Sequence, residues 1–205
     1  MPAAKPRPAN GGNLKQRALA AAHRMLETQG EAGLTLRAIA AELRTGQGSL
    51  YHHFTNKDAL LAELAVDGFR ELGRWMASAS PPEGRTRFFA CGHAYLGFTR
   101  RRPALYAIMY NERLMAGNER VRRAEAEAFE VYRGSLESLD VAEADLADAA
   151  LALWALSRGM ASISGRVGSA SPGVAKQLAF RVMNGLEALA GVSLIAVART
   201  ARDVA

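Results

Sequence analysis

The chain has 205 residues, of which 49% are hydrophobic and 7% aromatic, a composition typical of an alanine- and leucine-rich helical protein of one large or two modest domains. It has no run of 18 apolar residues free of charge, and its first 30 residues lack the apolar core of a signal peptide. The lone Cys91 excludes an intramolecular disulfide. We therefore expect a cytoplasmic protein without a membrane segment.

The positive charge is concentrated near the N-terminus. The net charge is +6, and residues 1–60 contain eight Lys and Arg against four Asp and Glu, so they hold four of the six excess charges. Such a balance can indicate a membrane surface or a nucleic acid as partner. A cluster at one end favours a phosphate-binding face over a protein that compacts DNA with its whole surface.

The N-terminal segment is expected to be a flexible basic arm over residues 1–12, because its Pro, Gly and Ala cannot bury enough apolar surface to order it. A first helix is predicted from near Asn13 to near Gly30. Its inward stripe comprises Leu14, Ala18, Ala21, Ala22 and Met25.

Next comes a pair of short helices. Leu36, Ile39, Ala40 and Leu43 recur at the spacing of one helical face, and Thr35 can cap that helix. Gly46 and Gly48 interrupt the pattern, and helix resumes over residues 49–54. There Leu50 and Phe54 share a buried side, while Gly48, Ser49 and His52 lie opposite. Two short helices around a tight turn, the second with polar groups outward, predict a helix-turn-helix DNA-binding unit.

The rest of the chain is also expected to be helical, since no strand-like alternation occurs. A fourth helix runs from Lys57 through Trp75, before residues 78–84 break it, and links two domains. Five further helices are predicted at residues 87–102, 104–115, 119–139, 142–164 and 173–198. The fold class is all-α, with a helix-turn-helix domain at 13–60 and a larger helical domain at 61–205.

The last two predicted helices carry apolar stripes broad enough to need packing partners on more than one side. Such helices suit a subunit interface. We therefore expect a homodimer.

Residues 13–64 resemble the DNA-binding domain of the TetR family of transcriptional regulators. The segments that carry the likeness are LTLRAIAAEL, GQGSLYHHF and NKDALL. The chain departs from the family in the turn, where Arg44, Thr45 and Gly46 replace a glycine, a small apolar residue and a hydroxyl cap. We expect Arg44 to take the left-handed conformation, with a backbone strain that glycine would not have.

The predicted recognition helix supplies two kinds of DNA contact. Candidates for base edges are Gln47, Gly48, Ser49 and His52, since Gln reads adenine bidentately and Gly48 permits close approach. Candidates for phosphate contacts are Thr35, Arg37, Tyr51, His53 and Lys57. The resemblance implies this role for Tyr51 and His53. Lys57 stands in a first helical turn, where the dipole disfavours a cation, so a phosphate partner would explain it. The alternatives are that Thr35 is only a cap and Lys57 a solvated lysine beside Asp58.

Likeness in the second domain is shorter, in AYLGFTRRRPALYAIMY and WALSRGMASI, where Arg158 replaces the histidine of one family subgroup. The family role of this domain is to bind a small-molecule inducer and to dimerise through its last two helices. The candidate pocket has Phe88, Cys91, Tyr95 and Phe98 on one wall, Trp154 opposite and Arg158 nearby. Such a pocket suits an apolar ligand. The alternative is that these side chains are simply core.

No cofactor, metal or catalytic activity is expected. The adjacent His52 and His53 point about 100° apart, and no catalytic triad, carboxylate pair or phosphate-cradling loop occurs. We interpret the chain as a sequence-specific transcriptional regulator, a ligand-responsive repressor that binds a palindromic operator as a homodimer. The alternative is a helical small-molecule-binding protein or enzyme that uses the C-terminal pocket.

Overall fold

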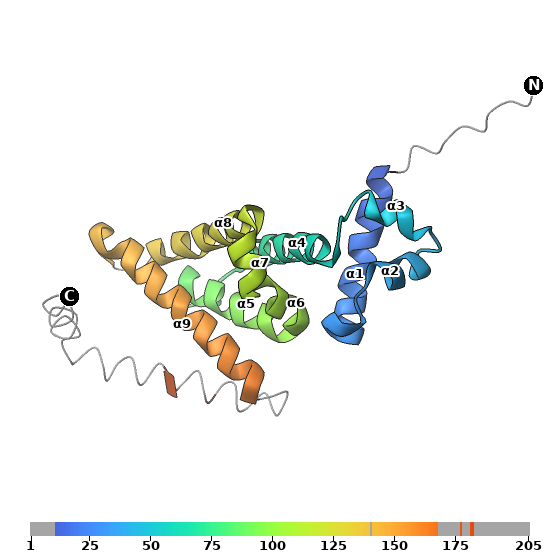
Figure 1. Ribbon diagram of the computed structural model, residues 1–205. Coiled ribbons are helices and arrows are strands. Elements are labelled where there is room, and N and C mark those ends of the chain that lie inside the picture. The colour runs from blue at the N-terminus through green and yellow to red at the C-terminus, as the bar shows by residue number, and fades with distance from the viewer. Residues whose placement is uncertain (1–10, 140, 168–176, 178–180, 183–205) are drawn as a thin grey trace, which may run out of the picture. The chain divides into compact units, whose positions relative to one another are not determined.

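The structure, a computed structural model, describes residues 11–139, 141–167, 177 and 181–182 (Figure 1). These residues contain helices and no strand, and none of their helices is long and apolar enough to cross a bilayer. The chain divides into two compact units, residues 1–154 and 155–205. The first unit holds all the helices up to the first turns of the last one.

The helical bounds follow the chain in order. They are α1 Gly11–Gly33, α2 Leu36–Glu42, α3 Gln47–Tyr51, α4 Lys57–Ser78, α5 Arg87–Arg101, α6 Pro103–Met109, α7 Glu112–Gly117, α8 Glu119–Ser135 and α9 Leu146–Val167. Short 3₁₀ segments at Leu136–Ser138 and Glu143–Asp145 precede α9. The all-α expectation is confirmed for these residues.

The three N-terminal helices pack on one another around a small core. The predicted inward stripe of α1 is confirmed: Ala18, Ala21, Ala22 and Met25 are buried, and Leu14 is half-buried. Ile39 of α2 is also fully buried. At Gly30 the backbone leaves the helical conformation with φ 70° and ψ −178°, which only glycine adopts at little cost. The expected end of the first helix is thus a kink, followed by a short helical continuation to Gly33.

Side-chain caps set most of the helix starts. The Thr35 hydroxyl accepts a hydrogen bond from the Ala38 amide at 3.0 Å, as predicted, and Asn56 and Thr86 cap α4 and α5 in the same way. These caps satisfy amides that have no partner within the helix.

Several predicted helix bounds are wrong in detail. The predicted helix at 104–115 is two helices, because Asn111 leaves the helical conformation and its side chain accepts from the Arg113 and Leu114 amides. Asn118 likewise starts α8, which ends at Ser135 in a 3₁₀ turn. The recognition helix begins earlier than expected, at Gln47. Residues 1–10 of the predicted arm lie outside the described residues, and Gly11 and Gly12 begin α1. The predicted helix at 173–198 also lies outside them, apart from residues 177, 181 and 182, which are helical.

Helix α4 is central to the first unit and runs from α1–α3 into the layer formed by α5, α6 and α8 (Figure 1). Its buried side includes Leu60, Leu64, Phe69 and Leu72. At Gly68 an added Cβ would lie 2.7 Å from Met109 Sδ and 3.2 Å from Leu105 Cγ, so the Met109 side chain would have to move to admit it. Helices α4 and α6 therefore approach closely at this glycine, and α6 also contacts α1.

Candidate nucleic-acid interface and aromatic core

The recognition helix presents its polar residues to solvent. Gln47, Gly48, Ser49 and His52 are all exposed, while Leu50 and Phe54 are buried at 0% and 1% exposure. The Phe54 amide donates to the Leu50 carbonyl at 2.8 Å, which holds the two apolar side chains together on the inner side. The chain thus has a short helix with a buried apolar side and exposed polar side chains opposite, as base recognition requires.

The predicted phosphate-contacting residues surround this helix. Thr35, Arg37 and Tyr51 are exposed, and His53 is half-buried with its ring edge-on to Phe54 at 6.5 Å. Gln47 Nε2 donates to the Tyr51 hydroxyl at 3.4 Å, so one exposed face joins a base-reading candidate to a phosphate-contacting one. Their roles remain predictions.

Lys57 has a protein partner that was not expected. Its Nζ donates to the main-chain carbonyl of Glu31 at 2.8 Å and lies 3.7 Å from the Glu31 carboxylate. Glu31 belongs to the last turn of α1, where carbonyls lack helical partners and attract cations. The adjacent Asp58 pairs instead with Arg113 at 2.6 Å. The position of Lys57 is therefore explained within the chain, although the other two N–H groups of its ammonium can still donate to a phosphate.

The turn between α2 and α3 is a Schellman motif. The Thr45 amide donates to the Ala40 carbonyl at 3.0 Å, and the Arg44 amide donates to Ala41 at 3.1 Å. Arg44 occupies the left-handed position with φ 51°, as predicted, and among the described residues no other non-glycine residue has a positive φ. The family-like turn is thus formed with an arginine where glycine is favoured.

Charged side chains link α1 to α4 and α4 to α8. Glu63 of α4 accepts from Lys15 of α1 at 3.0 Å and from Arg120 of α8 at 2.7 Å. The bond from Arg120 lowers the pKa of the Glu63 carboxyl, although partial burial opposes the shift. A second contact runs from His23 Nε2 to Asp67 Oδ2 at 3.7 Å.

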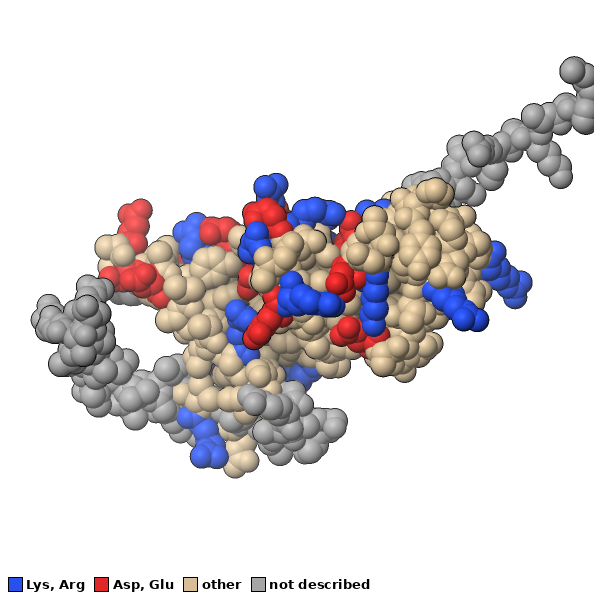
Figure 2. All heavy atoms as spheres, viewed as in Figure 1, with Lys and Arg blue, Asp and Glu red and all other residues tan. Residues whose placement is uncertain are grey.

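On the face shown in Figure 2, the charges of the first unit are distributed unevenly. In Figure 2 separate Lys and Arg side chains project from the end that carries α1–α3, whereas acidic and basic side chains intermingle over α4 and α8. The intermingling matches the printed pairs, such as Arg133 with Glu130 at 2.7 Å on α8.

The residues predicted to form one wall of a pocket do share a face of α5. Cys91, Tyr95 and Phe98 are buried, and Phe88 is half-buried. Trp154 approaches this face: its ring lies edge-on to Tyr95 with 5.2 Å between centroids. The two predicted walls are therefore in contact. Arg158 belongs to the second unit, where its side chain is exposed.

Tyr132 of α8 was not among the predicted pocket residues, yet it is central to this cluster. Its ring packs edge-on against Trp154 at 5.2 Å and against Phe88 at 5.9 Å. Its hydroxyl donates to the Leu153 carbonyl at 3.4 Å. The available signal was its place on the buried face of α8 with Val121, Ala124 and Ala128. We call Phe88, Tyr95, Tyr106, Tyr132 and Trp154 the aromatic core.

The three tyrosine hydroxyls of the aromatic core lie within hydrogen-bond distance of partners. The Tyr95 and Tyr106 hydroxyls are 2.8 Å apart, within hydrogen-bond distance. Burial, with a smaller effect of Tyr110 and Tyr106, raises the pKa of Tyr95 far above its ordinary value. Burial also raises the pKa of the Cys91 thiol, so this cysteine is a neutral, unreactive group in the resting fold.

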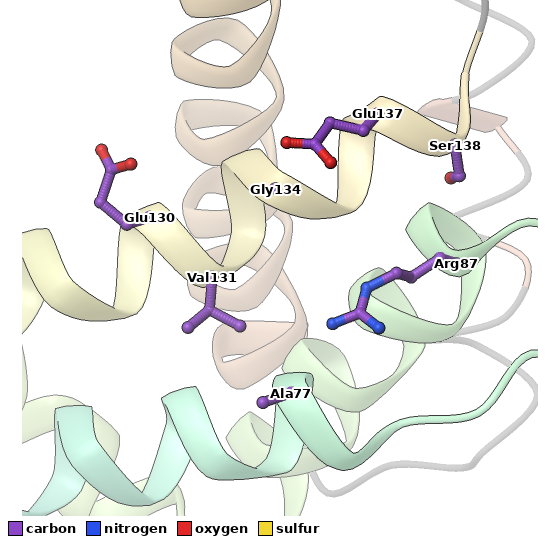
Figure 3. A pocket seen from close by; sticks show the side chains of 7 residues that line it. All are labelled: Ala77, Arg87, Glu130, Val131, Gly134, Glu137 and Ser138. Carbon is purple, nitrogen blue, oxygen red and sulfur yellow. The ribbon is translucent and has the colours of Figure 1, made fainter.

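Two grooves follow the junction of α4 and α8. One, of about 580 Å³, lies between the end of α4, the start of α5 and the end of α8. In Figure 3 Arg87 and Val131 point into it, while Glu130 points away. The second, of about 300 Å³, has Phe69, Gly73 and Ala128 on its floor and Arg74 among its lining residues. Neither groove is lined by the aromatic core. The described residues contain no group of three or more His, Cys, Asp or Glu able to hold a metal ion.

Comparison with known proteins places these features in a family. Residues 18–64 match the family of bacterial regulatory proteins of the tetR type, and residues 88–186 match the tetracyclin repressor-like C-terminal domain. The HTH-type transcriptional regulator YobS of Bacillus subtilis is 32% identical over 87 residues, which are 42% of this chain and 46% of YobS. The chain thus matches about half the length of that relative.

Solved structures show the same fold. A protein of unknown function from Rhodococcus sp. RHA1 is 27% identical with a TM-score of 0.68, and the match covers 88% of this chain and 98% of that one. The transcriptional regulator SCO7222, a TetR from Streptomyces coelicolor, is 25% identical with a TM-score of 0.57, and the match covers 72% of this chain and 70% of that one.

Proposed function

Because this chain is a DNA-binding transcriptional regulator of the TetR family, we propose that it is a ligand-responsive repressor that acts as a homodimer on a palindromic operator. The observation that carries the proposal is the recognition helix, whose exposed Gln47, Ser49 and His52 stand on a fully buried Leu50. The proposed place of action is the cytoplasm.

In this proposal the two kinds of contact are divided as the sequence predicts. Gln47, Gly48, Ser49 and His52 approach base edges in the major groove. Thr35, Arg37, Tyr51, His53 and Lys57 bind the phosphates beside it. The exposure of most of these side chains supports the assignment.

Selection of bound sequences from a random DNA pool tests the proposal directly. We expect a palindrome whose half-sites are separated by about 34–36 Å, one turn of DNA, or a multiple of it. His52→Ala should change the selected bases in both half-sites. If the wild-type protein enriches no sequence, the proposal of a sequence-specific regulator is wrong.

The proposed dimer forms through α9 and the predicted helix at 173–198. One supporting observation in the first unit is Leu151, whose side chain is 60% exposed although it is large and apolar. In the second unit Ile163 of the same helix is 39% exposed. We expect Leu151→Asp to shift the protein toward monomers in analytical ultracentrifugation, whereas Leu151→Met should not.

The proposed inducer is apolar and binds at the face of α5 that carries Phe88, Cys91, Tyr95 and Phe98, with Trp154 opposite. Since Tyr95 and Trp154 are in contact, a ligand must separate these rings as it enters. This movement would reach the DNA-binding helices through α4, which packs against α5, α6, α8 and α1. A ligand has this effect only if it binds the two arrangements with different affinity.

A screen of apolar compounds by tryptophan fluorescence and thermal shift tests the inducer site. A binder should weaken operator affinity, and operator DNA should weaken the binder by the same factor. Cys91→Phe should abolish binding of large ligands and leave operator affinity unchanged. If an inducer binds Cys91→Phe and Trp154→Ala as it binds the wild type, the site lies elsewhere.

A further inference from the structure

The cations around the helix-turn-helix differ in whether they have an acidic partner. Arg24 of α1 donates to Glu42 at 2.6 Å, Lys15 pairs with Glu63 at 3.0 Å, and Lys57 lies 3.7 Å from Glu31. Arg44 is exposed and has no hydrogen bond from its side chain and no ion pair with any described residue. Glu42, the nearest acid in sequence, is already engaged by Arg24. Within the described part of the chain, the Arg44 guanidinium therefore has no acidic partner.

The backbone of Arg44 is strained. It holds φ 51° at the left-handed position of the Schellman motif, where a residue with a Cβ costs about 1–2 kcal/mol more than in the right-handed conformation. Glycine would occupy the position with little cost. Among the described residues, none forms a hydrogen bond or ion pair with the Arg44 side chain that would offset this strain. A strained residue with no structural gain indicates a function for its side chain.

The position of Arg44 suits a contact with DNA. It precedes Gln47, the first residue of α3, by three residues, which span at most about 10 Å. The N-terminal residues of a recognition helix enter the major groove, which is about 12 Å wide and bordered by phosphates. A long cationic side chain on the turn that leads into this helix can therefore reach the border of the groove.

We propose that Arg44 is a further DNA contact of this protein, which binds a backbone phosphate beside the major groove through its guanidinium. The inference rests on the proposed function, since it places α3 in that groove. A guanidinium suits a phosphate because its fork of N–H groups can donate two parallel hydrogen bonds. The contact contributes affinity and register rather than base preference.

The test compares Arg44→Gly, Arg44→Lys and the wild type by thermal unfolding, and by binding to the selected operator and to random DNA over a range of salt concentrations. The matched control is Arg74→Gln, which removes one exposed arginine from α4, remote from the recognition helix in sequence.

Arg44→Gly should melt at a higher temperature, yet bind both DNAs about tenfold more weakly at low salt. Its plot of log affinity against log salt should be shallower by about one unit for each DNA-binding head. Arg44→Lys should regain the slope and most of the affinity, and Arg74→Gln should match the wild type. Equal affinity and slope for Arg44→Gly and the wild type on both DNAs would overturn the inference. Because random DNA suffices for this comparison, the result is independent of whether an operator is found.

Discussion

The helix-turn-helix and the aromatic core use polar side chains in opposite ways. Around α3 the apolar side chains of Leu50 and Phe54 are buried, and the polar groups of Gln47, Ser49 and His52 face solvent. In the aromatic core the polar atoms are inside, where the Tyr95 and Tyr106 hydroxyls meet at 2.8 Å. The proposed DNA contacts of the first region thus need no rearrangement of the fold. The proposed inducer could enter the second region only if packed rings move.

The largest effect is expected where packing and proposed function coincide, at Trp154. Its side chain is 5% exposed and its ring contacts Tyr95, Tyr132 and Phe129. Trp154→Ala should lower the free energy of unfolding by about 3–5 kcal/mol in chemical denaturation. His52→Ala, the matched change on the exposed helix, should alter it by less than about 0.5 kcal/mol. A loss below about 1 kcal/mol for Trp154→Ala would show that these rings line open space instead of holding the core.

The next effect separates the two kinds of DNA contact. Gln47→Ala should reduce discrimination at particular operator positions by about 1–3 kcal/mol, measured with single-base operator variants. Lys57→Ala should weaken all sequences alike and reduce the salt slope by about one unit. Because Lys57 also donates a hydrogen bond to the Glu31 carbonyl, Lys57→Ala should lower the melting temperature as well. Equal losses on specific and random DNA for both variants would contradict the division.

A smaller effect concerns Glu63, which joins α1 to α8. Its pKa is lowered in the folded protein by Arg120 and Lys15, so its contribution to stability is present above the usual carboxyl pKa of 4.5 and is lost as the pH falls through the lowered value. Glu63→Gln should cost about 1 kcal/mol at pH 7 and progressively less below pH 4.5. Glu130→Gln, which breaks an exposed pair on α8 alone, should change stability little. A cost for Glu63→Gln that does not depend on pH would contradict this origin.

The smallest change in stability is expected at Thr35, whose hydroxyl caps α2. Thr35→Asp keeps the cap and places a negative charge at a helix N-terminus. The free energy of unfolding should therefore change by no more than about a few tenths of a kcal/mol, measured by thermal unfolding. Operator affinity should nevertheless fall, because a carboxylate repels a phosphate. Unchanged affinity would indicate that Thr35 is a cap and does not contact DNA.

The two regions also differ in how much of their structure could be predicted from the sequence. The helix-turn-helix was predictable because its signals are local: Thr35 precedes the helix it caps, and Leu50 and Phe54 lie one turn apart. The break at Asn111 was missed, because an asparagine between apolar segments can either cap a helix or lie within one. The partner of Lys57 was missed for another reason, since Glu31 is 26 residues away and the contact depends on how α1 and α4 pack.

The aromatic core marks the limit of prediction from sequence. A large side chain on a buried helix face can line a cavity or fill it, and both roles leave the same periodicity. The sequence predicts that a wall on α5 and Trp154 oppose one another across a pocket. In the structure the Tyr95 and Trp154 rings are in contact, and this contact and the place of Tyr132 depend on the packing of three helices. The structure therefore narrows the inducer proposal to ligands that enter by displacing rings.

Because Cys91 is buried, its thiol can report local unfolding of the protein without any engineered label. The chain has a single cysteine, and its side chain is 1% exposed. A thiol reagent can modify it only in molecules whose helices have separated locally. The rate of modification therefore depends on the fraction of locally open molecules, as the rate of amide hydrogen exchange does. The rate at which the native thiol is modified thus reports local unfolding of the helices that bury Cys91.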